Sequence, residues 1–452
     1  MLNCILAMDA ARVARGGDMN FTLSERLRSL FDHLDLQRAH VATQLPAEIS
    51  DFVRENPQRV AGLLCMEAIG LDSAPFQSVA DRMVIVAGDR GMSAKVAEAA
   101  APMLAGARRV ILRDYGAPVW ADSVSDHAET VISALLTLTG EATSPAATVK
   151  SGEHAGVTYS VHGTGPALLL FPLFLSSAQW KAALPAISRH YTVFVLGGPY
   201  LGGVALLEDR AASPSYAAMV HTVLDVMNPS AGQTLLETGA GSGAVARIAA
   251  RHKPAIGPLT AVDINEFLLH EAKALAQRDG LDDRITFAPG NAESLPFADA
   301  SFDHAFTVTV LEECDADVAL RELLRVVKPG GRVGVIVRAI DMPYPWNVDV
   351  AEDIKRKIEQ APALIGPRGV ADRSVYPRMR KAGFTELTCF PMLSSFDQIG
   401  GPFWSYLESR VVSRLTSDEA VAFLEAMTQA REAGVLFCSC PHHCVVGRKP
   451  VG

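Results

Sequence analysis

Apolar runs of strand length alternate with helix-length amphipathic stretches along nearly the whole chain. Clear runs of this kind occupy residues 39–42, 62–66, 83–87, 109–112, 167–173, 192–196, 234–237 and 259–262. Such alternation is typical of parallel sheets covered by helices, because two parallel strands need a long crossover that usually contains a helix. A chain of 452 residues is long enough for about two or three packed cores. The sequence therefore predicts an α/β protein with more than one domain.

Two stretches interrupt this alternation and predict domain boundaries. Between Gly140 and Gly156, small and polar residues replace the apolar periodicity, which is typical of a linker. A weaker boundary lies at residues 228–232, which read Asn-Pro-Ser-Ala-Gly. The expected organisation is an N-terminal tail (1–18), a first α/β segment (19–140), the linker (141–155), a second segment (156–228) and a C-terminal domain (229–452).

The charge and hydropathy of the chain argue against some classes of partner. A net charge of -9 and the lack of a Lys/Arg cluster among aromatic residues argue against binding to a phosphate backbone. The longest apolar run, residues 167–175, is about half the length that a membrane-spanning helix needs. Residues 1–19 carry arginines but no apolar stretch followed by a small-residue cleavage site, so they do not read as a signal peptide. We therefore expect a cytoplasmic protein that acts on a small molecule, with no nucleic-acid or membrane partner.

The seven cysteines are spread thinly, which is typical of a reducing compartment. A cluster near the C-terminus nevertheless suggests a metal site: Cys438, Cys440, His442, His443 and Cys444. That stretch reads as a strand. Alternate side chains of a strand form a row about 6.6 Å apart, which is too extended to enclose one tetrahedral ion. We therefore expect no bound metal.

The strongest single motif is a glycine-rich turn between a strand and a helix, at residues 235–247. Gly239, Gly241 and Gly243 would let the backbone turn tightly beneath a ligand, because a Cβ atom there would collide with it. The next strand ends at Asp263, where a carboxylate can accept hydrogen bonds from both ribose hydroxyl groups. On its own the motif leaves open a nucleotide-binding dehydrogenase or a purely structural turn.

Three further segments follow in a fixed order: Pro-Gly-Asn-Ala-Glu-Ser-Leu-Pro-Phe (289–297), Ala-Ser-Phe-Asp-His-Ala-Phe (300–306) and Leu-Arg-Val-Val-Lys-Pro-Gly-Gly-Arg-Val (324–333). Together with the glycine turn and Asp263, this set resembles the class I S-adenosylmethionine-dependent methyltransferase family. The resemblance covers roughly residues 229–452. It implies a Rossmann-like seven-stranded sheet whose last strand, within residues 434–450, runs in the reverse direction.

The resemblance also implies S-adenosylmethionine as the cofactor and assigns a role to each matching residue. Glu237 would hold the amino group of the methionine moiety, Gly239 and Gly241 would approach the cofactor, Asp263 would bind the ribose, Ile264 would pack on the adenine, and Asn291 and Ala292 would face the adenine edge. The family usually has an acid at the position of Asn291. An amide oxygen still accepts a hydrogen bond but lacks the charge, so we expect weaker binding.

The acceptor is expected just beyond the fourth and fifth strands, because ligands of parallel α/β sheets gather at the carboxyl ends of the strands. The candidate substrate-binding residues there are Thr309, Asp341, Tyr344 and Trp346. Glu312 is the candidate general base and Glu313 the reserve. For Glu312 the alternative is a helix-start carboxylate stabilised by the helix dipole.

The front of the chain resembles an α/β-hydrolase whose halves are exchanged. Residues 21–138 resemble the C-terminal half of that fold, and residues 156–203 resemble its beginning. The resemblance places Gln44 at the nucleophile position, Gly91 at the acid position and Ala117 at the base position. None of these three residues can act as the nucleophile, acid or base of a catalytic triad, so no acyl-transfer chemistry is expected.

The sequence leaves open whether the two hydrolase-like segments form one permuted sheet or pack separately. We expect this region to shield the acceptor pocket or to mediate formation of a homodimer. The predicted function is methyl transfer to an O, N or C atom of a small specialised metabolite. Two alternatives stay open: a protein that uses S-adenosylmethionine in a non-methylating reaction such as a cyclisation, and an inactive binding or scaffold protein.

Overall fold

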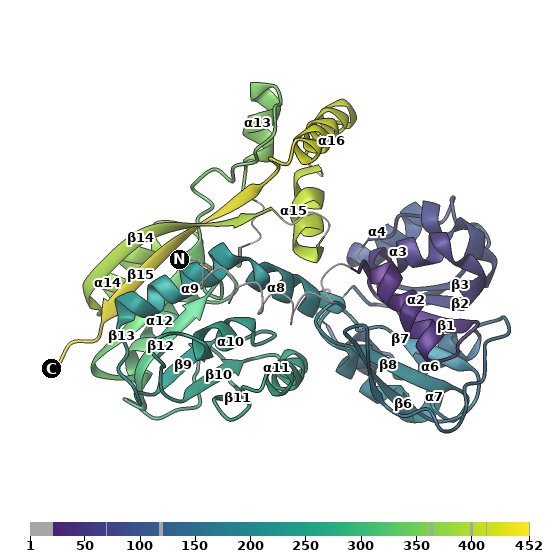
Figure 1. Cartoon of the computed structure of the whole chain (residues 1–452), viewed down its shortest axis with the longest axis horizontal. Coiled ribbons are helices and arrows are strands. Elements are labelled where there is room, and N and C mark those ends of the chain that lie inside the picture. Colours follow the sequence, from purple (N-terminus) through teal and green to yellow (C-terminus); the bar gives the residue numbers. More distant parts are fainter. Residues whose placement is uncertain are drawn as a thin grey trace, which may run out of the picture. The chain divides into compact units, whose positions relative to one another are not determined.

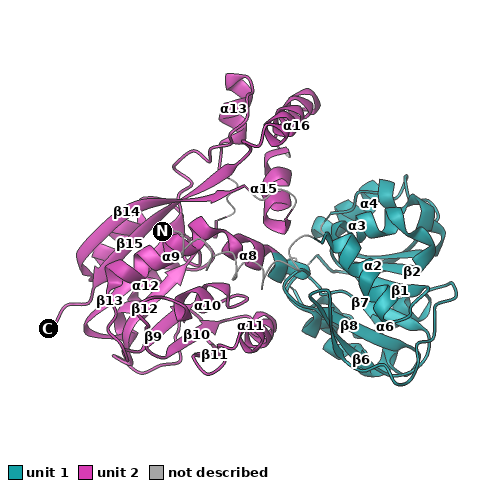
Figure 2. Cartoon of the chain, in the orientation of Figure 1, with its two compact units in different colours: residues 1–205 teal, residues 206–452 magenta. Residues whose placement is uncertain are grey.

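The computed structural model describes residues 21–68, 70–116, 121–361, 365–397, 401–412 and 414–451. The predicted tail (1–18) and Ala117 lie outside the described residues. The chain divides into two compact units, Met1–Ala205 and Leu206–Gly452 (Figure 2). This division lies earlier than the weak boundary expected at residues 228–232. Residues 206–228 therefore belong to the C-terminal unit, where they form part of its core.

The first unit contains one sheet of eight strands in the order β4-β3-β2-β1-β7-β8-β6-β5. The strands are β1 (Ala39–Thr43), β2 (Val60–Met66), β3 (Met83–Gly88), β4 (Arg108–Leu112), β5 (Gly152–His154), β6 (Val157–His162), β7 (Ala167–Leu170) and β8 (Thr192–Gly197). β1 pairs in parallel with both β2 and β7, whereas β6 is antiparallel to β5 and β8. Strands from both sides of the predicted linker thus share a single sheet. The hydrolase resemblance of this unit stays a prediction.

Both faces of this sheet are buried, which explains why its strands read as continuous apolar runs. Along β2, Leu63 and Cys65 join a core with α2 (Leu23–His33), α3 (Pro46–Glu55) and α4 (Gly91–Ala100). Leu64 and Met66 point to the opposite face, where they join a core that includes α6 (Ala128–Leu136), α7 (Leu184–Ile187) and Trp180. Adjacent strand residues alternate between faces, so β2 contributes to both layers.

The second unit contains a sheet of seven strands in the order β11-β10-β9-β12-β13-β15-β14. The strands are β9 (Leu235–Thr238), β10 (Leu259–Asp263), β11 (Ile285–Pro289), β12 (Phe302–Val308), β13 (Val327–Arg338), β14 (Thr385–Phe396) and β15 (Cys438–Arg448). β15 is antiparallel to both β13 and β14, and the other neighbouring strands pair in parallel. The expected reversed last strand and the Rossmann-like seven-stranded sheet are confirmed.

Helices cover both faces of this sheet. The core on one face includes α9 (Pro214–Met227), α10 (Ala244–Ala250) and α11 (Glu266–Arg278). The core on the other face includes α12 (Ala316–Val326) and α14 (Val375–Ala382). None of the helices in the described part of the chain is both long and apolar enough to cross a bilayer.

Three further helices gather beyond the ends of β14 and β15 and form what we call the helical cap (Figure 1). They are α13 (Glu352–Ile358), α15 (Pro402–Val412) and α16 (Ser417–Glu432). Their apolar residues share a core with Tyr344 and Trp346, which follow β13, and with Cys438, which begins β15. β15 is antiparallel to β13, so its first residues lie at the carboxyl edge of the parallel strands. The cap therefore lies at the part of this edge next to β13 and β15.

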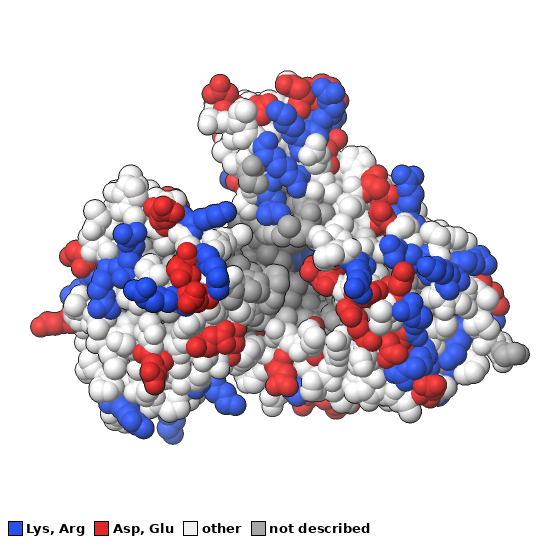
Figure 3. Space-filling view, turned by 180° about the vertical axis from the view of Figure 1, so that it is seen from behind, with Lys and Arg blue, Asp and Glu red and all other residues white. Residues whose placement is uncertain are grey.

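Acidic and basic side chains lie close to one another over much of the surface shown in Figure 3.

Candidate functional site

The glycine turn after β9 adopts a conformation that only glycine adopts easily. Gly239 and Gly241 have left-handed φ angles of +75° and +53°. The amide of Gly239 donates to the carbonyl of Val262 at 2.7 Å. The amide of Gly241 donates to Oδ2 of Asp263 at 2.7 Å. The turn is thereby fastened to the end of β10.

Asp263 is held between the glycine turn and the start of α11. Its Oδ1 accepts a hydrogen bond from the backbone amide of Asn265 at 2.8 Å, and its side chain is largely buried. Burial raises the pKa of Asp263 above its ordinary value, while hydrogen bonds from the amides of Asn265 and Gly241 act in the opposite direction. The carboxylate thus has a fixed orientation at the carboxyl edge of the sheet.

Glu237 lies on β9 beneath the same turn and is 1% exposed. Its Oε2 is buried and has no hydrogen-bond partner among the described residues. Burial, together with the nearby charge of Asp263, raises the pKa of Glu237 well above its ordinary value. A buried carboxylate in this state is costly unless a cation or a donor reaches it. The Oε2 atom of Glu237 is therefore available to accept a hydrogen bond from a positively charged ligand group.

The other residues expected at the adenine lie on two neighbouring segments. Ile264, directly after β10, is 71% exposed, which is unusual for a large apolar side chain and leaves it open to a flat ligand. Asn291 is exposed, and its Oδ1 accepts a hydrogen bond from the amide of Glu293 at 2.9 Å. The amide oxygen expected to face the adenine thus already bonds within its own turn. Ala292 is half-buried.

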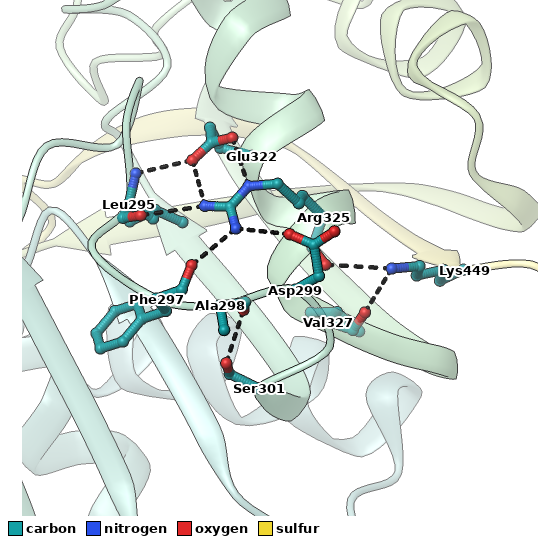
Figure 4. Close-up of polar contacts among 9 residues, drawn as sticks. All are labelled: Leu295, Phe297, Ala298, Asp299, Ser301, Glu322, Arg325, Val327 and Lys449. Carbon is teal, nitrogen blue, oxygen red and sulfur yellow. Dashed lines mark hydrogen bonds and ion pairs between the residues drawn. The ribbon is translucent and has the colours of Figure 1, made fainter.

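Arg325 on α12 holds residues 295–299, which follow Asn291 and Ala292 in the same loop (Figure 4). The Arg325 guanidinium donates to the carbonyls of Phe297 at 2.7 Å and Leu295 at 3.1 Å. It also forms ion pairs with Glu322 at 2.7 Å and Asp299 at 2.9 Å. Glu322 in turn accepts the amide of Leu295 at 2.8 Å. This network holds the loop against α12.

Glu312 lies in the turn between β12 and α12 and is fully buried. Its Oε1 accepts the backbone amide of Arg338 at 2.8 Å and lies 3.5 Å from Nε of the same arginine. Its Oε2 has no hydrogen-bond partner among the described residues. Burial raises the pKa of Glu312, and the charge of Arg338 opposes that shift. Asp315 accepts the amide of Val318 and caps α12, so Glu312 is not the carboxylate at the helix start.

The remaining acceptor-side candidates differ in their availability. Glu313 is 67% exposed and lies 3.7 Å from Arg338. Thr309 has a left-handed φ of +54°, a strained conformation that recurs at functional sites. Asp341 is paired with His443 at 2.8 Å and with Arg373 at 3.2 Å. The Asp341 carboxylate, which was expected to contact the substrate, therefore already has two partners within the protein.

Tyr344 and Trp346 line a small pocket between the carboxyl edge and the cap, with room for about one water molecule. The other lining residues are Ile358, Gln360, Leu407, Val411, Cys438, Ser439 and Cys440. The Tyr344 hydroxyl is buried without a hydrogen-bond partner in the described part of the chain. The Trp346 ring packs edge-on against Trp404 and Phe423, with centroids 5.3 and 5.4 Å apart. The pocket is mainly apolar, with a few polar atoms in its wall.

Comparison with known proteins shows what the C-terminal unit is similar to. Residues 236–335 match the family model described as a methyltransferase domain. Methyltransferase phqN of Penicillium fellutanum is 29% identical over 180 residues, which cover 40% of this chain and 54% of the relative. The ubiquinone/menaquinone biosynthesis C-methyltransferase UbiE of Rhodopseudomonas palustris (strain TIE-1) is 34% identical over 136 residues, which cover 29% of this chain and 53% of the relative. The chain spans about half the length of these curated relatives.

The matched segment runs from β9 to β13 and contains the glycine turn, Asp263 and Asn291. This region is a class I S-adenosylmethionine-dependent methyltransferase domain. Among solved structures, the cyclase SpnF is similar to this chain at 22% identity and a TM-score of 0.35, over 55% of this chain and 92% of that one.

The residues of the methyltransferase domain fit its cofactor, S-adenosylmethionine. The unpartnered Oε2 of buried Glu237 can accept a hydrogen bond from the ammonium group of the methionine end. The fixed carboxylate of Asp263 is suited to the ribose hydroxyl groups, and exposed Ile264 to the adenine face. The roles of these residues remain predictions.

The sequence analysis did not single out Arg210 on α8 (Gly202–Ala212) or Tyr216 on α9, and it named His442 on β15 only as part of a possible metal cluster. The Arg210 guanidinium lies 5.1 Å from the centre of the Tyr216 ring, and that ring lies 6.2 Å from the ring of His442. Arg210 and Tyr216 precede the expected boundary at residues 228–232, so the sequence assigned them to a different segment. No sequence signal of their own distinguishes them from ordinary helix residues.

The C-terminal cysteines and His442 lie on β15, as expected for a strand. Within the described residues, no group of three or more His, Cys, Asp or Glu side chains could hold a metal ion.

Proposed function

We propose that the protein transfers a methyl group from S-adenosylmethionine to an O, N or C atom of a small molecule bound beneath the helical cap. The observation that carries the proposal is the convergence of Glu237, Gly241 and Asp263 within the residues that match the methyltransferase family. Tyr344 and Trp346, which follow β13 and pack in the apolar core of the cap, support an acceptor site at the carboxyl edge.

S-adenosylmethionine supplies a methyl group bonded to a positively charged sulfur. The protein's own part is to hold both reactants in line, since positioning supplies much of the rate in such a transfer. Asp263 and Glu237 orient the cofactor, and the cap residues exclude water from the acceptor. When the acceptor carries a proton at the reacting atom, Glu312 removes it through its unpartnered Oε2.

Replacing Asp263 by alanine is expected to weaken binding of S-adenosylmethionine at least about tenfold. The reason is the loss of a charged hydrogen-bond acceptor, which contributes about 1.5–3 kcal/mol. Calorimetric titration measures the affinity directly. The matched control is Asp282→Ala, because Asp282 is exposed in the segment before β11. Equal affinity for wild type and the Asp263 variant would remove the ribose assignment and with it the main support for the cofactor site.

Replacing Glu312 by glutamine is expected to lower kcat about 100-fold or more for an acceptor that must lose a proton. Because burial raises the pKa of Glu312, wild-type activity should fall as the pH decreases through a value above that of an ordinary glutamate. The variant should lack this acidic limb. The measurement is a pH–rate profile for wild type, Glu312→Gln and Glu313→Gln. An unchanged profile in Glu312→Gln would make this residue structural, and an effect confined to Glu313→Gln would pass the role to the reserve base.

The same assay separates methyl transfer from its alternatives. Turnover that releases S-adenosylhomocysteine in step with product supports the proposal. Product formation without S-adenosylhomocysteine would mean that the cofactor assists a non-methylating reaction such as a cyclisation. Cofactor binding without any turnover on a broad set of acceptors and extracts would favour a binding or scaffold protein.

We also propose that the first unit is a permuted hydrolase-like domain without hydrolase chemistry. Gln44 follows β1, at the position where the resemblance expects a nucleophile. Its Oε1 accepts the amide of Phe174 at 2.7 Å, and its Nε2 donates to the carbonyl of Glu67 at 3.3 Å. An amide that is buried and bonded to the backbone in this way supports a structural role at that position.

A further inference from the structure

The helix α8 carries two adjacent acids, Glu208 and Asp209, that bind two different parts of the methyltransferase domain. Glu208 reaches the glycine turn, and Asp209 reaches the first turn of α15 in the helical cap. Adjacent residues of a helix point about 100° apart, so one helix can contact two neighbours at the same level. Both acids precede the residues that match the methyltransferase family, 236–335. The match therefore assigns neither of them a role.

Glu208 holds the glycine turn through the side chain of Ser242, which lies between Gly241 and Gly243. The Ser242 hydroxyl donates to Oε1 of Glu208 at 2.6 Å. Oε2 of Glu208 pairs with the guanidinium of Arg247, which also donates to the carbonyl of Ser242 at 3.0 Å. The Glu208 side chain is 14% exposed and that of Arg247 only 5%, so removing the acid would leave a buried cation without this partner. The position of the turn therefore depends on Glu208.

The preceding residue of α8, Leu207, packs against the same turn. Its Cδ1 lies 3.2 Å from the place that a Cβ atom of Gly241 would take. The amide of Gly241 donates to Asp263, whose carboxylate is assigned to the ribose. The helix α8 therefore contacts two consecutive residues of the turn, Gly241 and Ser242, and the first of them orients that carboxylate.

Asp209 holds the start of α15. Its Oδ2 accepts the amide of Phe403, the second residue of α15, at 2.9 Å. The fit is close, because a Cβ atom on Gly401 would lie 2.4 Å from the same oxygen. The first amides of a helix lack partners within the helix, and a carboxylate there also interacts favourably with the helix dipole. Phe403 and Trp404 are buried in the core of the cap together with Trp346, so Asp209 ties this core to α8.

We propose that Glu208 and Asp209 are positioning residues that couple the cofactor site to the cap. Binding of the cofactor at the glycine turn fixes α8, and α8 then fixes α15 at the carboxyl edge. Consecutive residues of one helix make the two contacts, so a displacement at one is passed to the other without an intervening flexible segment. The coupling is reciprocal, since a cap held by Asp209 also favours the turn conformation that binds the cofactor. This inference rests on the proposed function, because it concerns the same cofactor and acceptor sites.

The test is hydrogen–deuterium exchange of the full-length protein with and without saturating S-adenosylhomocysteine, read at the amides of residues 405–408 in α15. In wild type, the ligand should slow exchange at these amides about fivefold or more. Asp209→Ala should remove this effect and should weaken binding of the ligand by no more than the same factor, because the coupling is reciprocal. Asp209→Asn keeps an oxygen that can accept the Phe403 amide, so it should restore most of the effect. Gly401→Ala, which displaces the Asp209 carboxylate from the side of the cap, should also remove it.

Glu208→Ala should weaken binding of S-adenosylhomocysteine about tenfold or more, measured by calorimetry, and the saturating ligand should no longer slow exchange in α15. Glu208→Gln keeps an acceptor for Ser242 but not the charge that pairs with Arg247, so it should show both effects in part and serves if Glu208→Ala does not fold. Asp418→Ala is the matched control, because Asp418 is an exposed acid in the first turn of α16 in the same cap. It should change neither the affinity nor the exchange. Thermal unfolding shows whether each variant is folded.

Two results would overturn the coupling and leave the proposed function in place. One is wild type that binds S-adenosylhomocysteine without slower exchange in α15. The other is slower exchange that survives in Glu208→Ala or in both Asp209→Ala and Gly401→Ala, because α8 would then not transmit it. If wild type does not bind S-adenosylhomocysteine, the proposed function fails and the coupling fails with it.

Discussion

Replacing Gly239 by alanine is expected to lower the affinity for S-adenosylhomocysteine about 100-fold or more, which corresponds to about 2.7 kcal/mol. A Cβ atom at this position would lie 2.1 Å from Cγ2 of Val310, and the residue has a φ of +75°. Val310 is β-branched and cannot turn away easily, so the backbone must move instead. That movement would disturb the amide of Gly239 and, two residues on, the Gly241 amide that holds Asp263.

Gly232→Ala is the matched control for this experiment. Gly232 has a φ of +83°, but a Cβ atom there would meet nothing within 4 Å. Because only the left-handed conformation is unfavourable for alanine here, this variant should lose about 1–2 kcal/mol of folding stability. It should bind the cofactor normally. Titration calorimetry and thermal unfolding of both variants separate strain from collision. Normal cofactor affinity in Gly239→Ala would show that this turn does not approach the cofactor.

The sequence predicted the part of the site that is built from local motifs. The glycine turn and Asp263 at the end of β10 follow from short segments whose spacing is set by one strand–turn–helix unit, whereas the reversed β15 was implied by the family resemblance. Glu237 and Glu312 were named as well. The sequence did not reveal the burial or the hydrogen bonding of these two carboxylates. Both are buried, and each keeps one oxygen without a partner among the described residues.

The acceptor side could not be predicted as well, because it is assembled from segments far apart in the chain. Arg210 and Tyr216 come from helices before β9, whereas Cys440 and His442 come from the last strand. Asp341 was expected to face the substrate, but its pairing with His443 and Arg373 depends on how β15 and the segment before α14 meet. Likewise, the eight-stranded sheet of the first unit joins segments on both sides of the predicted linker, and local periodicity does not reveal such pairing.

Replacing Glu237 by glutamine is expected to stabilise the cofactor-free protein at neutral pH and to weaken cofactor binding roughly 150-fold. The second effect follows from the loss of a buried charged partner for the methionine ammonium, about 3 kcal/mol. The first follows from the direction of its pKa shift. Because burial raises the pKa of Glu237 in the folded protein, its contribution to stability is complete below the unfolded-state pKa and is lost as the pH rises through the folded value.

A glutamine at this position does not titrate, so the difference in Tm between Glu237→Gln and wild type should grow from pH 5 to pH 8 and should reverse when S-adenosylhomocysteine is added. Glu48→Gln in the first unit is the matched control. Glu48 also has a buried Oε2 without a partner among the described residues, and burial raises its pKa to about 8. This control should show the same stabilisation with rising pH but unchanged cofactor affinity. If Glu237→Gln gains stability and still binds the cofactor normally, the ammonium is held elsewhere and Glu237 is only a buried acid of the sheet.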